Sequence, residues 1–216
     1  MKVEMPSRRL EGCGRDLRGA IPASEVLRVM EWYDSIAPSY DGLYVNEQHG
    51  KYSIISQVIG SEYKKILDVG CGSAEFLLFS CKKNQSKVLY IGIDISFNLL
   101  TIAREKALSL TDVCGSIAEF IAGDLSVPPL REDARFDLII LVSVLRSTYD
   151  VEAIVDYFTQ RHLDEGGAIV LTVMYESDCN VREGSLCPKN ARLIGIVHRN
   201  EVACIVSKSE QECRTR

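Results

Sequence analysis

The stretch ILDVGCGSAE, residues 66–75, decides the fold of this chain. Its first residues suit a buried strand, which runs into Gly70-Cys71-Gly72 and then into a helical pattern. A strand that ends in a Gly-x-Gly turn and enters a helix lets a ligand approach the backbone closely. The first turn of the helix also offers free N–H groups to a polar or anionic ligand. The stretch therefore predicts a ligand-binding loop at the end of a strand.

Two residues exclude the dinucleotides, one cofactor class that uses such a loop. The dinucleotide fingerprint is G-x-G-x-x-G, and Glu75 stands where the third glycine belongs. A carboxylate at that point would repel a pyrophosphate. Asp68, two residues before the first glycine, is also not part of that fingerprint.

Strands and helices alternate on both sides of the loop. Apolar runs predict strands at 65–69, 88–93, 119–122, 136–141 and 168–173, and amphipathic runs predict helices at 74–82, 97–108 and 151–163. Apolar strands joined by amphipathic helices indicate a parallel sheet covered on both faces. Two last runs, 191–197 and 202–206, predict an antiparallel hairpin. The predicted fold is α/β: a Rossmann-like, doubly wound, mostly parallel seven-stranded sheet with a C-terminal antiparallel hairpin.

Four regions follow from these patterns. We expect a flexible leader at 1–20, an N-terminal helical cap at 21–60, a core at 61–208 and a tail at 209–216. The cap contains helical patterns at 24–37 and 52–59, separated by a turn at 37–39 and closed by Gly60.

Charge and hydropathy limit the classes of function. The net charge is −5 and the pI is about 5.3, so direct binding to nucleic acid without a partner is disfavoured. The longest apolar run, 138–145, is too short for a membrane helix and predicts a buried strand. Residues 1–12 lack the apolar segment of a signal peptide, so we expect a cytoplasmic protein that does not associate with membranes.

The eight cysteines are expected to be reduced thiols. They form no C-x-x-C pair and lie at no metal-ligand spacing from a histidine, so we expect no metal site. A bridge between Cys179 and Cys187 stays open, as in the intracellular disulfides of hyperthermophiles.

The loop resembles the first motif of the class I S-adenosylmethionine-dependent methyltransferases, an apolar pair followed by D/E-x-G-x-G-x-G. Asp68, Gly70 and Gly72 fit this motif, and Ala74 replaces the third glycine. Asp94 in YIGIDIS and Asp124 in FIAGDLSVPP follow at the spacing of the family. Further segments, from WYDSIAPSYDGLY to HLDEGGAIVLTV, extend the resemblance over residues 32–174. It implies that the core binds S-adenosyl-L-methionine.

The resemblance also assigns residues to parts of this cofactor. Asp68 belongs to the loop motif, and Gly70, Cys71, Gly72 and Ser73 would lie against the methionine end. Asp94 would accept hydrogen bonds from the ribose hydroxyls, since bonds to a charged group are the stronger ones. Asp124 would hold the adenine amino group, and Ile95 and Leu125 would lie about the adenine ring. Leu141 would line the cavity near the sulfur, and Tyr40 would close over the amino-acid moiety.

The catalytic residues are less defined, and Tyr40 and Arg146 are the candidates. Many relatives carry histidine where Arg146 stands, which argues against a histidine-assisted mechanism and favours an anion-holding role or a surface role. The segment LVSVLRS lacks the N-P-P-Y signature of enzymes that methylate planar amino groups, so such acceptors are disfavoured.

Three functions stay open. The first is a methyltransferase for a small metabolite, and the second is an RNA or translation-factor methyltransferase that works with a small activator subunit. The third is a catalytically silent cofactor-binding module. Residues 175–190 show no helical period where relatives have a helix, which would expose an apolar flank to an activator subunit or to a second copy of the chain.

Overall fold

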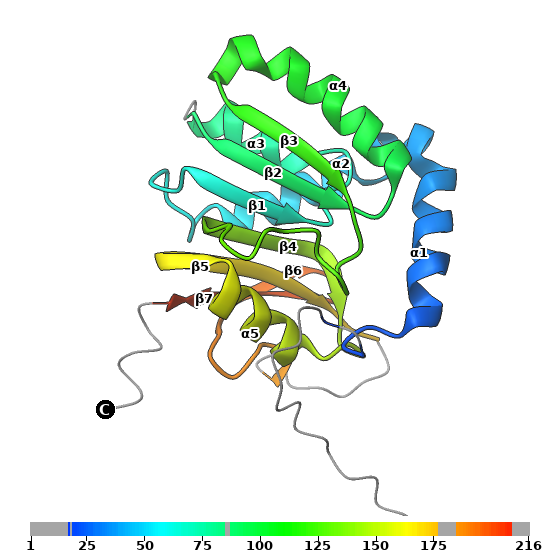
Figure 1. Ribbon diagram of the computed structural model, residues 1–216, viewed down its shortest axis with the longest axis vertical. Coiled ribbons are helices and arrows are strands. Elements are labelled where there is room, and N and C mark those ends of the chain that lie inside the picture. Colours follow the sequence, from blue (N-terminus) through cyan, green and yellow to red (C-terminus); the bar gives the residue numbers. More distant parts are fainter. Residues whose placement is uncertain (1–16, 18, 85–86, 177–184, 209–216) are drawn as a thin grey trace, which may run out of the picture.

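A computed structural model describes residues 17, 19–84, 87–176 and 185–208 of the 216-residue chain. One seven-stranded sheet, in the order β3-β2-β1-β4-β5-β7-β6, forms its centre (Figure 1). The strands are β1 (Lys65–Val69), β2 (Leu89–Asp94), β3 (Ile117–Ala122), β4 (Phe136–Arg146), β5 (Leu163–Met174), β6 (Arg192–His198) and β7 (Glu201–Ser207). The helices are α1 (Ala23–Ile36), the 3₁₀ turn η1 (Ala37–Ser39), α2 (Tyr40–Ile55), α3 (Glu75–Asn84), α4 (Phe97–Cys114) and α5 (Val151–Arg161).

The strand directions confirm the predicted fold class. Strands β1 to β5 pair in parallel, while β7 pairs antiparallel with both β5 and β6. The hairpin β6–β7 therefore closes one edge of the sheet. Since β1 lies between β2 and β4, the chain reverses its direction of winding at the carboxyl ends of β1 and β4. Open α/β sheets bind their ligands at such a point.

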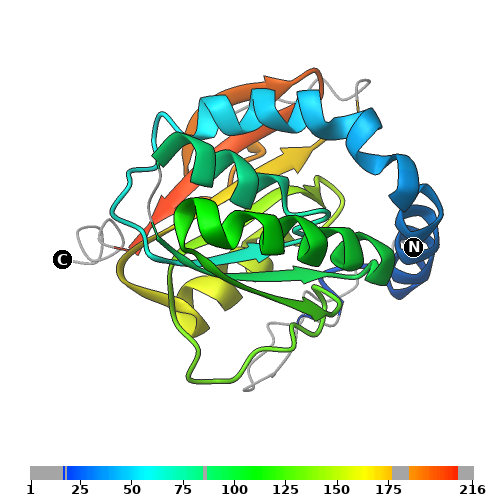
Figure 2. The same ribbon diagram turned by 90° about the horizontal axis from the view of Figure 1, so that it is seen from above.

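The two faces of the sheet are covered differently. Helices α2, α3 and α4 lie side by side on one face (Figure 2), where Ile55, Leu77 and Leu100 pack against Tyr90 and Ile140. On the other face α5 is the helix that packs on the sheet, through Ile154 and Phe158. The N-terminal Leu17 and the segment around Leu186 complete this second cluster. Leu17 is buried and its N–H donates to the Ser126 carbonyl at 2.7 Å, so the predicted leader ends in a packed segment.

The N-terminal cap differs from the prediction in its second helix. The sequence predicted a helix at 52–59, whereas α2 runs from Tyr40 to Ile55. The turn at 37–39 is a single 3₁₀ turn with Pro38 near its start, and the chain resumes a helix directly after it. Helix α2 contains Gly42 and Gly50. Because glycine has a low helix propensity, these two residues weakened the helical pattern in the sequence.

The expectation of reduced thiols is wrong for four cysteines. Cys81 of α3 is bonded to Cys114 at the end of α4, and Cys187 is bonded to Cys204 of β7. Because Cys187 is already paired, it does not bridge to Cys179, which lies outside the described residues. Both pairs join residues that only the tertiary fold brings together, and the spacing along the chain did not reveal them. Cys71 is a buried free thiol.

Two helices were expected to be absent, and the structure tests this only for the residues that it describes. Among them, no helix is long and apolar enough to cross a membrane. The described residues between β5 and β6 form no α-helix, as expected, and residues 177–184 of this connection lie outside the description.

Candidate functional site

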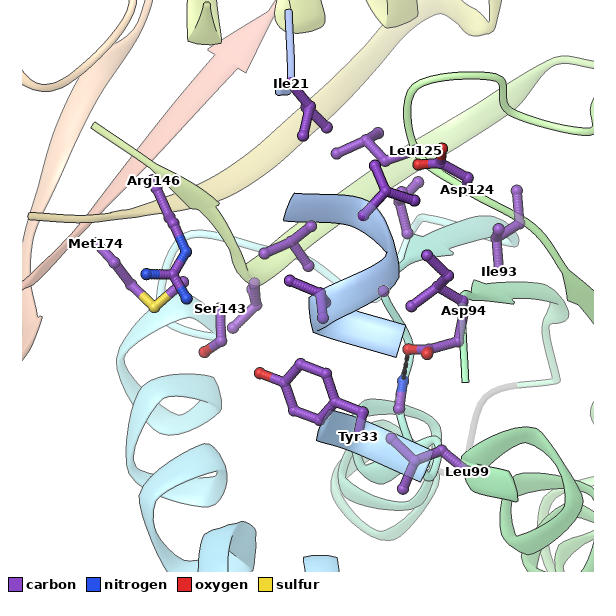
Figure 3. A pocket seen from close by; sticks show the side chains of 18 of the residues that line it. Ile21, Tyr33, Ile93, Asp94, Leu99, Asp124, Leu125, Ser143, Arg146 and Met174 are labelled. Atoms are coloured by element: carbon purple, nitrogen blue, oxygen red, sulfur yellow. Dashed lines mark hydrogen bonds between the residues drawn. The ribbon is translucent and has the colours of Figure 1, made fainter. Parts of the chain in front are cut away.

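A cavity of about 320 Å³ lies at the carboxyl edge of the sheet, beneath α1 and α2 (Figure 3). The ends of β1, β2, β4 and β5 supply its floor through residues such as Val69, Ile93, Val142 and Met174. Tyrosines from the two cap helices, Tyr33, Tyr40 and Tyr44, line it from the other side. A volume near 300 Å³ with mostly apolar walls is typical of a small-molecule site.

The glycine loop requires glycine at two positions. Gly70 has a φ of +74°, and the Val144 Cγ2 atom lies 2.3 Å from where a Cβ would stand. Gly72 has a φ of +53°, and the Tyr40 hydroxyl lies 3.2 Å from the corresponding point. Residues with a Cβ rarely adopt such φ values. The loop therefore lines the cavity with bare backbone, and Tyr40 lies directly over Gly72.

Asp94, at the end of β2, is buried beside this loop. One carboxylate oxygen accepts a hydrogen bond from the Gly72 N–H at 2.7 Å (Figure 3). The other accepts one from the Ser96 N–H at 2.8 Å. Burial raises the pKa of this carboxyl to about 6, against the effect of these two bonds. Each oxygen retains a lone pair for a further donor. Asp94 is thus a rigid acceptor of hydrogen bonds at the cavity wall.

Asp124 and Leu125 form the wall beyond Asp94, after β3. The Asp124 carboxylate accepts bonds from the Ser126 N–H at 2.9 Å and from the Ser126 hydroxyl. This local turn fixes the direction of the Asp124 side chain.

Eight of the predicted site residues line the cavity together: Tyr40, Gly70, Gly72, Asp94, Ile95, Asp124, Leu125 and Arg146. Four others do not: Asp68, Cys71, Ser73 and Leu141. The first group comes from five separate segments of the chain, which only the fold brings together.

The four residues outside the cavity support it from behind. Asp68 is buried and accepts a hydrogen bond from the Tyr90 hydroxyl at 2.5 Å, and burial raises the pKa of Asp68 to about 7. The buried Cys71 thiol packs toward Gly92. The Ser73 hydroxyl donates to Asp41 of α2 at 2.5 Å. These residues position the loop and the cap rather than line the cavity.

Leu141 lies inside the core because β4 is longer than predicted. The sequence ended this strand at 141, but β4 continues to Arg146 through a bulge between Leu141 and Leu145. Leu141 has no exposed surface, and Val142, Ser143 and Val144 of the bulge line the cavity in its place. Ser143 has a φ of +61°, a strained backbone conformation of the kind that clusters at functional sites.

The two catalytic candidates differ in their surroundings. Tyr40 is largely buried, and burial raises its pKa far above the ordinary value, so its hydroxyl stays protonated at neutral pH. Arg146 is half-exposed, and its Nε lies 3.3 Å from the Glu25 carboxylate of α1. Tyr40 can donate a hydrogen bond but is a poor base, and the charge of Arg146 is already paired.

A buried polar cluster that was not predicted from the sequence lies at the other end of the cavity. The Lys51 ammonium is 1% exposed and contacts Glu47 and Glu201, each at 2.6 Å. It also donates to the Ser143 hydroxyl at 2.7 Å. Gln48 joins the cluster through a bond to Ser143 at 3.2 Å. A lysine in a polar-looking helix and a glutamate at a hairpin carry no sequence signal for burial, because only the fold brings them together.

Glu47, His198 and Glu201 lie close enough together to be considered as metal ligands, within 4.8 Å of one another. However, the Lys51 ammonium bonds to both carboxylates and supplies the positive charge at this point. This group therefore does not fit a metal centre.

Comparison with known proteins identifies the central part of the chain. Residues 67–169 match the family described as a methyltransferase domain. A stretch of 89 residues is 37% identical to uncharacterized protein MJ1252 of Methanocaldococcus jannaschii, which covers 38% of this chain and 30% of that protein. The chain thus matches less than a third of the length of this curated relative.

Solved structures share the fold at low identity. An S-adenosylmethionine-dependent methyltransferase from Clostridium acetobutylicum matches with a TM-score of 0.53 and 16% identity, over 81% of this chain and 98% of that one. A chain from the complex between the Haloferax volcanii Trm112 methyltransferase activator and a methyltransferase matches with a TM-score of 0.54 and 21% identity. That match covers 68% of this chain and 61% of the other.

Proposed function

We propose that the chain, in which residues 67–169 match a methyltransferase domain, belongs to the class I methyltransferase superfamily and binds S-adenosylmethionine in the cavity described above. The observation that carries the proposal is one arrangement of three groups. One cavity is lined, in the order expected for this cofactor, by the glycine loop at Gly70 and Gly72, by the buried Asp94 and by the Asp124–Leu125 turn.

The cavity fits the cofactor in shape and in donor chemistry. Gly70 and Gly72 line the cavity without side chains, so the methionine moiety can lie close to the backbone of the loop. The free lone pairs of Asp94 are suited to the two ribose hydroxyls, which are hydrogen-bond donors. The Asp124 carboxylate can accept a bond from the adenine amino group, while Ile95 and Leu125 contact the ring.

When bound, the cofactor supplies a methyl group on a positively charged sulfur that is already primed for displacement. The residues of this chain then have to align the acceptor and exclude water. Tyr33, Tyr40 and Tyr44 of the cap cover the loop and shield the cavity from solvent. The protonated Tyr40 hydroxyl is placed to donate a hydrogen bond above Gly72.

A small metabolite is the acceptor that this cavity favours. The cap helices α1 and α2 cover the carboxyl edge of the sheet, so the site is a pocket rather than an open groove. A small molecule can occupy such a pocket without any further domain.

The second candidate is an RNA or translation-factor methyltransferase that needs a small activator subunit. Its support is the Haloferax volcanii structure, in which the related methyltransferase is in complex with an activator. The third reading, a catalytically silent cofactor-binding module, predicts the same cofactor binding without turnover.

A calorimetric titration with S-adenosylhomocysteine, the demethylated product of the cofactor, tests the proposal. The wild-type chain should bind it and should not bind NAD. Asp94→Ala should raise the dissociation constant by at least about tenfold, because each hydrogen bond to a charged group is worth about 1.5–3 kcal/mol.

The matched control is Asp133→Ala, which removes a carboxylate that is largely exposed and lies outside the cavity. It should bind S-adenosylhomocysteine as the wild type does. Binding of NAD by the wild type, or equal affinity in wild type and Asp94→Ala, would contradict the proposal.

A further inference from the structure

The end of the cavity opposite Asp94 and Asp124 carries its own polar site. Glu47, Gln48 and Lys51 of α2, Ser143 of the β4 bulge and Glu201 of β7 form what we name the Lys51 cluster. All of these except Glu201 line the cavity. Figure 3 shows Ser143, Arg146 and Met174 on the side away from Asp94 and Asp124. The cluster therefore borders the part of the cavity that the proposed cofactor residues leave free.

Burying the charged groups of the Lys51 cluster costs more free energy than a purely structural feature would justify. A buried lysine and a buried glutamate lose their hydration, and their mutual attraction often fails to compensate for that loss. Lys51 is 1% exposed and Glu201 is 2% exposed. Ser143 also holds a strained positive φ, which brings its hydroxyl within reach of Lys51 and Glu201. Strain and buried charge at one cavity wall point to a binding role.

The donors of Lys51 and Ser143 are all engaged within the cluster. The three protons of the Lys51 ammonium go to Glu47, Glu201 and Ser143. The single proton of the Ser143 hydroxyl goes to Glu201 at 3.1 Å. Because Ser143 uses its proton toward Glu201, its oxygen can only accept from Gln48. The Gln48 atom that lies 3.2 Å from the Ser143 oxygen is therefore the donor Nε2. No donor of Lys51 or Ser143 is left to hold an anionic ligand.

One acceptor of the cluster is unused. Gln48 is 6% exposed, and its Oε1 has no hydrogen-bond partner among the described residues. A buried carbonyl oxygen without a partner costs about 1–3 kcal/mol, so this site is built to receive a donor. His162 Nε2 is the other such atom in the described part of the chain, and it does not line the cavity.

The charges at this end of the cavity favour a cation. Two carboxylates, Glu47 and Glu201, face one ammonium, and the His198 imidazole lies 3.7 Å from Glu47. With a neutral imidazole, the group carries one negative charge in excess. The other cation of the lining, Arg146, is paired with Glu25. Tyr44 and Tyr149 line the same cavity, and the faces of aromatic rings attract cations. Excess negative charge, an unused acceptor and aromatic walls together match a basic amine.

We propose that the Lys51 cluster binds the methyl acceptor and that this acceptor is an aliphatic amine. The N–H groups of the amine donate to Gln48 Oε1 and to the Glu47 carboxylate. This inference rests on the proposed function, because it assigns the acceptor for the same cavity.

The transfer step balances without a further reactant. The amine nitrogen, once it has lost its extra proton to Glu47 and then to solvent, attacks with its lone pair. A new N–CH₃ bond forms while the S–CH₃ bond of S-adenosylmethionine breaks, and that bonding pair stays on sulfur. The products are the methylated ammonium and S-adenosylhomocysteine. Lys51 keeps Glu47 and Glu201 in place and takes no part in the transfer.

Three probes with one skeleton test the inference. With S-adenosylhomocysteine at saturation, 2-phenylethylamine, 2-phenylethanol and 3-phenylpropanoate are each titrated into the full chain, and binding is followed by amide chemical shifts in NMR. The amine should bind about tenfold more tightly than the alcohol and the carboxylate. Gln48→Leu, which removes the acceptor at nearly the same volume, should abolish this preference.

The controls separate the inference from the proposed function. Gln57→Leu makes the same change at an exposed position and should keep the preference for the amine. The affinity for S-adenosylhomocysteine should be the same in wild type, Gln48→Leu and Gln57→Leu. Failure of the wild type to bind S-adenosylhomocysteine would overturn the proposed function itself.

Three other outcomes would overturn the inference alone. The first is equal or better binding of the alcohol or the carboxylate, or no binding of any probe up to its solubility limit. The second is an unchanged preference for the amine in Gln48→Leu. The third is a weaker affinity of Gln48→Leu for S-adenosylhomocysteine, which would assign Gln48 to the cofactor. Glu47→Gln provides an independent variant, and it should weaken amine binding and leave S-adenosylhomocysteine binding intact.

Discussion

At the scale of single residues, two glycines show how the backbone shapes the site. Gly70 and Gly72 hold positive φ values where Val144 and Tyr40 come close from two other elements. Glycine is required at both positions for two reasons, because the positive φ and the close neighbouring atoms each exclude a Cβ. Gly50 of α2, by contrast, meets neither condition.

Gly70→Ala should therefore lower the free energy of unfolding by about 2–4 kcal/mol, the sum of a left-handed backbone and an overpacked contact with Val144. Denaturant unfolding followed by circular dichroism measures this change. The matched control is Gly50→Ala, which should raise the free energy of unfolding by about 0.5–1 kcal/mol because alanine is the better helix former. Equal effects of the two substitutions would contradict this account of the loop.

Some residues of the site could be predicted from the sequence and others could not. Gly70, Asp94 and Asp124 each stand at the end of a predicted strand, so the fold alone brings them together. Leu141 was misplaced because a bulge, which no local pattern announces, extends β4 by five residues to Arg146. Lys51 and Glu201 were missed because their burial depends on the packing of α2 against the hairpin.

At the scale of elements, an ionic network fastens the cap to the core. Lys106 of α4 contacts Asp41 of α2 at 2.6 Å and Glu75 of α3 at 2.5 Å, and it donates to Ser73 at 2.9 Å. His49 of α2 contacts the other oxygen of Glu75 at 3.0 Å. Because α2 carries Tyr40 and Gln48, this network also sets their position over the cavity.

Lys106→Met should lower the free energy of unfolding by about 1–3 kcal/mol, since it leaves the Asp41 and Glu75 carboxylates facing each other without a cation. It should also speed amide hydrogen exchange in α2 and weaken the binding of S-adenosylhomocysteine. Lys82→Met, at an exposed position of α3, is the control and should do neither. Unchanged exchange in α2 of Lys106→Met would show that the network does not fasten the cap.

The bond between Cys187 and Cys204 ties the segment before β6 to the sheet. This segment covers the face on which α5 is the packed helix, so the bond compensates for sparse helical cover. Cys187→Ser should lower the free energy of unfolding by about 3 kcal/mol, as expected for a closed loop of this size. The difference should disappear when both proteins are unfolded in a reducing buffer. A difference that persists under reduction would indicate packing rather than the bond as its cause.

The elements themselves were largely predictable, and their ends were not. The five parallel strands and the hairpin were confirmed because each is an apolar run between turn residues. The extent of α2 was not, because Gly42 and Gly50 weaken its pattern and its stability comes from packing against α3 and β6. The disulfide pairs depend on which elements become neighbours, so they followed only from the fold.

At the scale of the whole molecule, buried carboxyl groups make stability depend on pH. Burial raises the pKa of Asp68 to about 7 and that of Asp94 to about 6, whereas an unfolded aspartate has a pKa of about 3.9. The folded state therefore binds these protons more tightly than the unfolded state does. Their stabilising effect is complete below about pH 4 and is lost as the pH rises through about 6 to 7.

Asp68→Asn should remove part of this dependence. As the pH rises from 4 to 8, the free energy of unfolding of the variant should rise relative to that of the wild type by on the order of 2–4 kcal/mol. Each unit of pKa difference contributes about 1.4 kcal/mol. Urea unfolding at a series of pH values gives the comparison. Asp133→Asn is the control. Asp133 is exposed and the neighbouring Arg131 lowers its pKa, so this variant should show no such gain in stability. Parallel pH profiles for wild type and Asp68→Asn would contradict the raised pKa.

We propose that one cavity at the carboxyl edge of the sheet binds S-adenosylmethionine at one end and the acceptor at the other. A crystal structure with S-adenosylhomocysteine would test both assignments. We expect ribose hydroxyls bonded to the Asp94 carboxylate, adenine between Ile95 and Leu125, and sulfur turned toward Ser143 and the Lys51 cluster. S-adenosylhomocysteine bound elsewhere, or a cavity without it at saturating concentration, would show that this cavity is not the cofactor site.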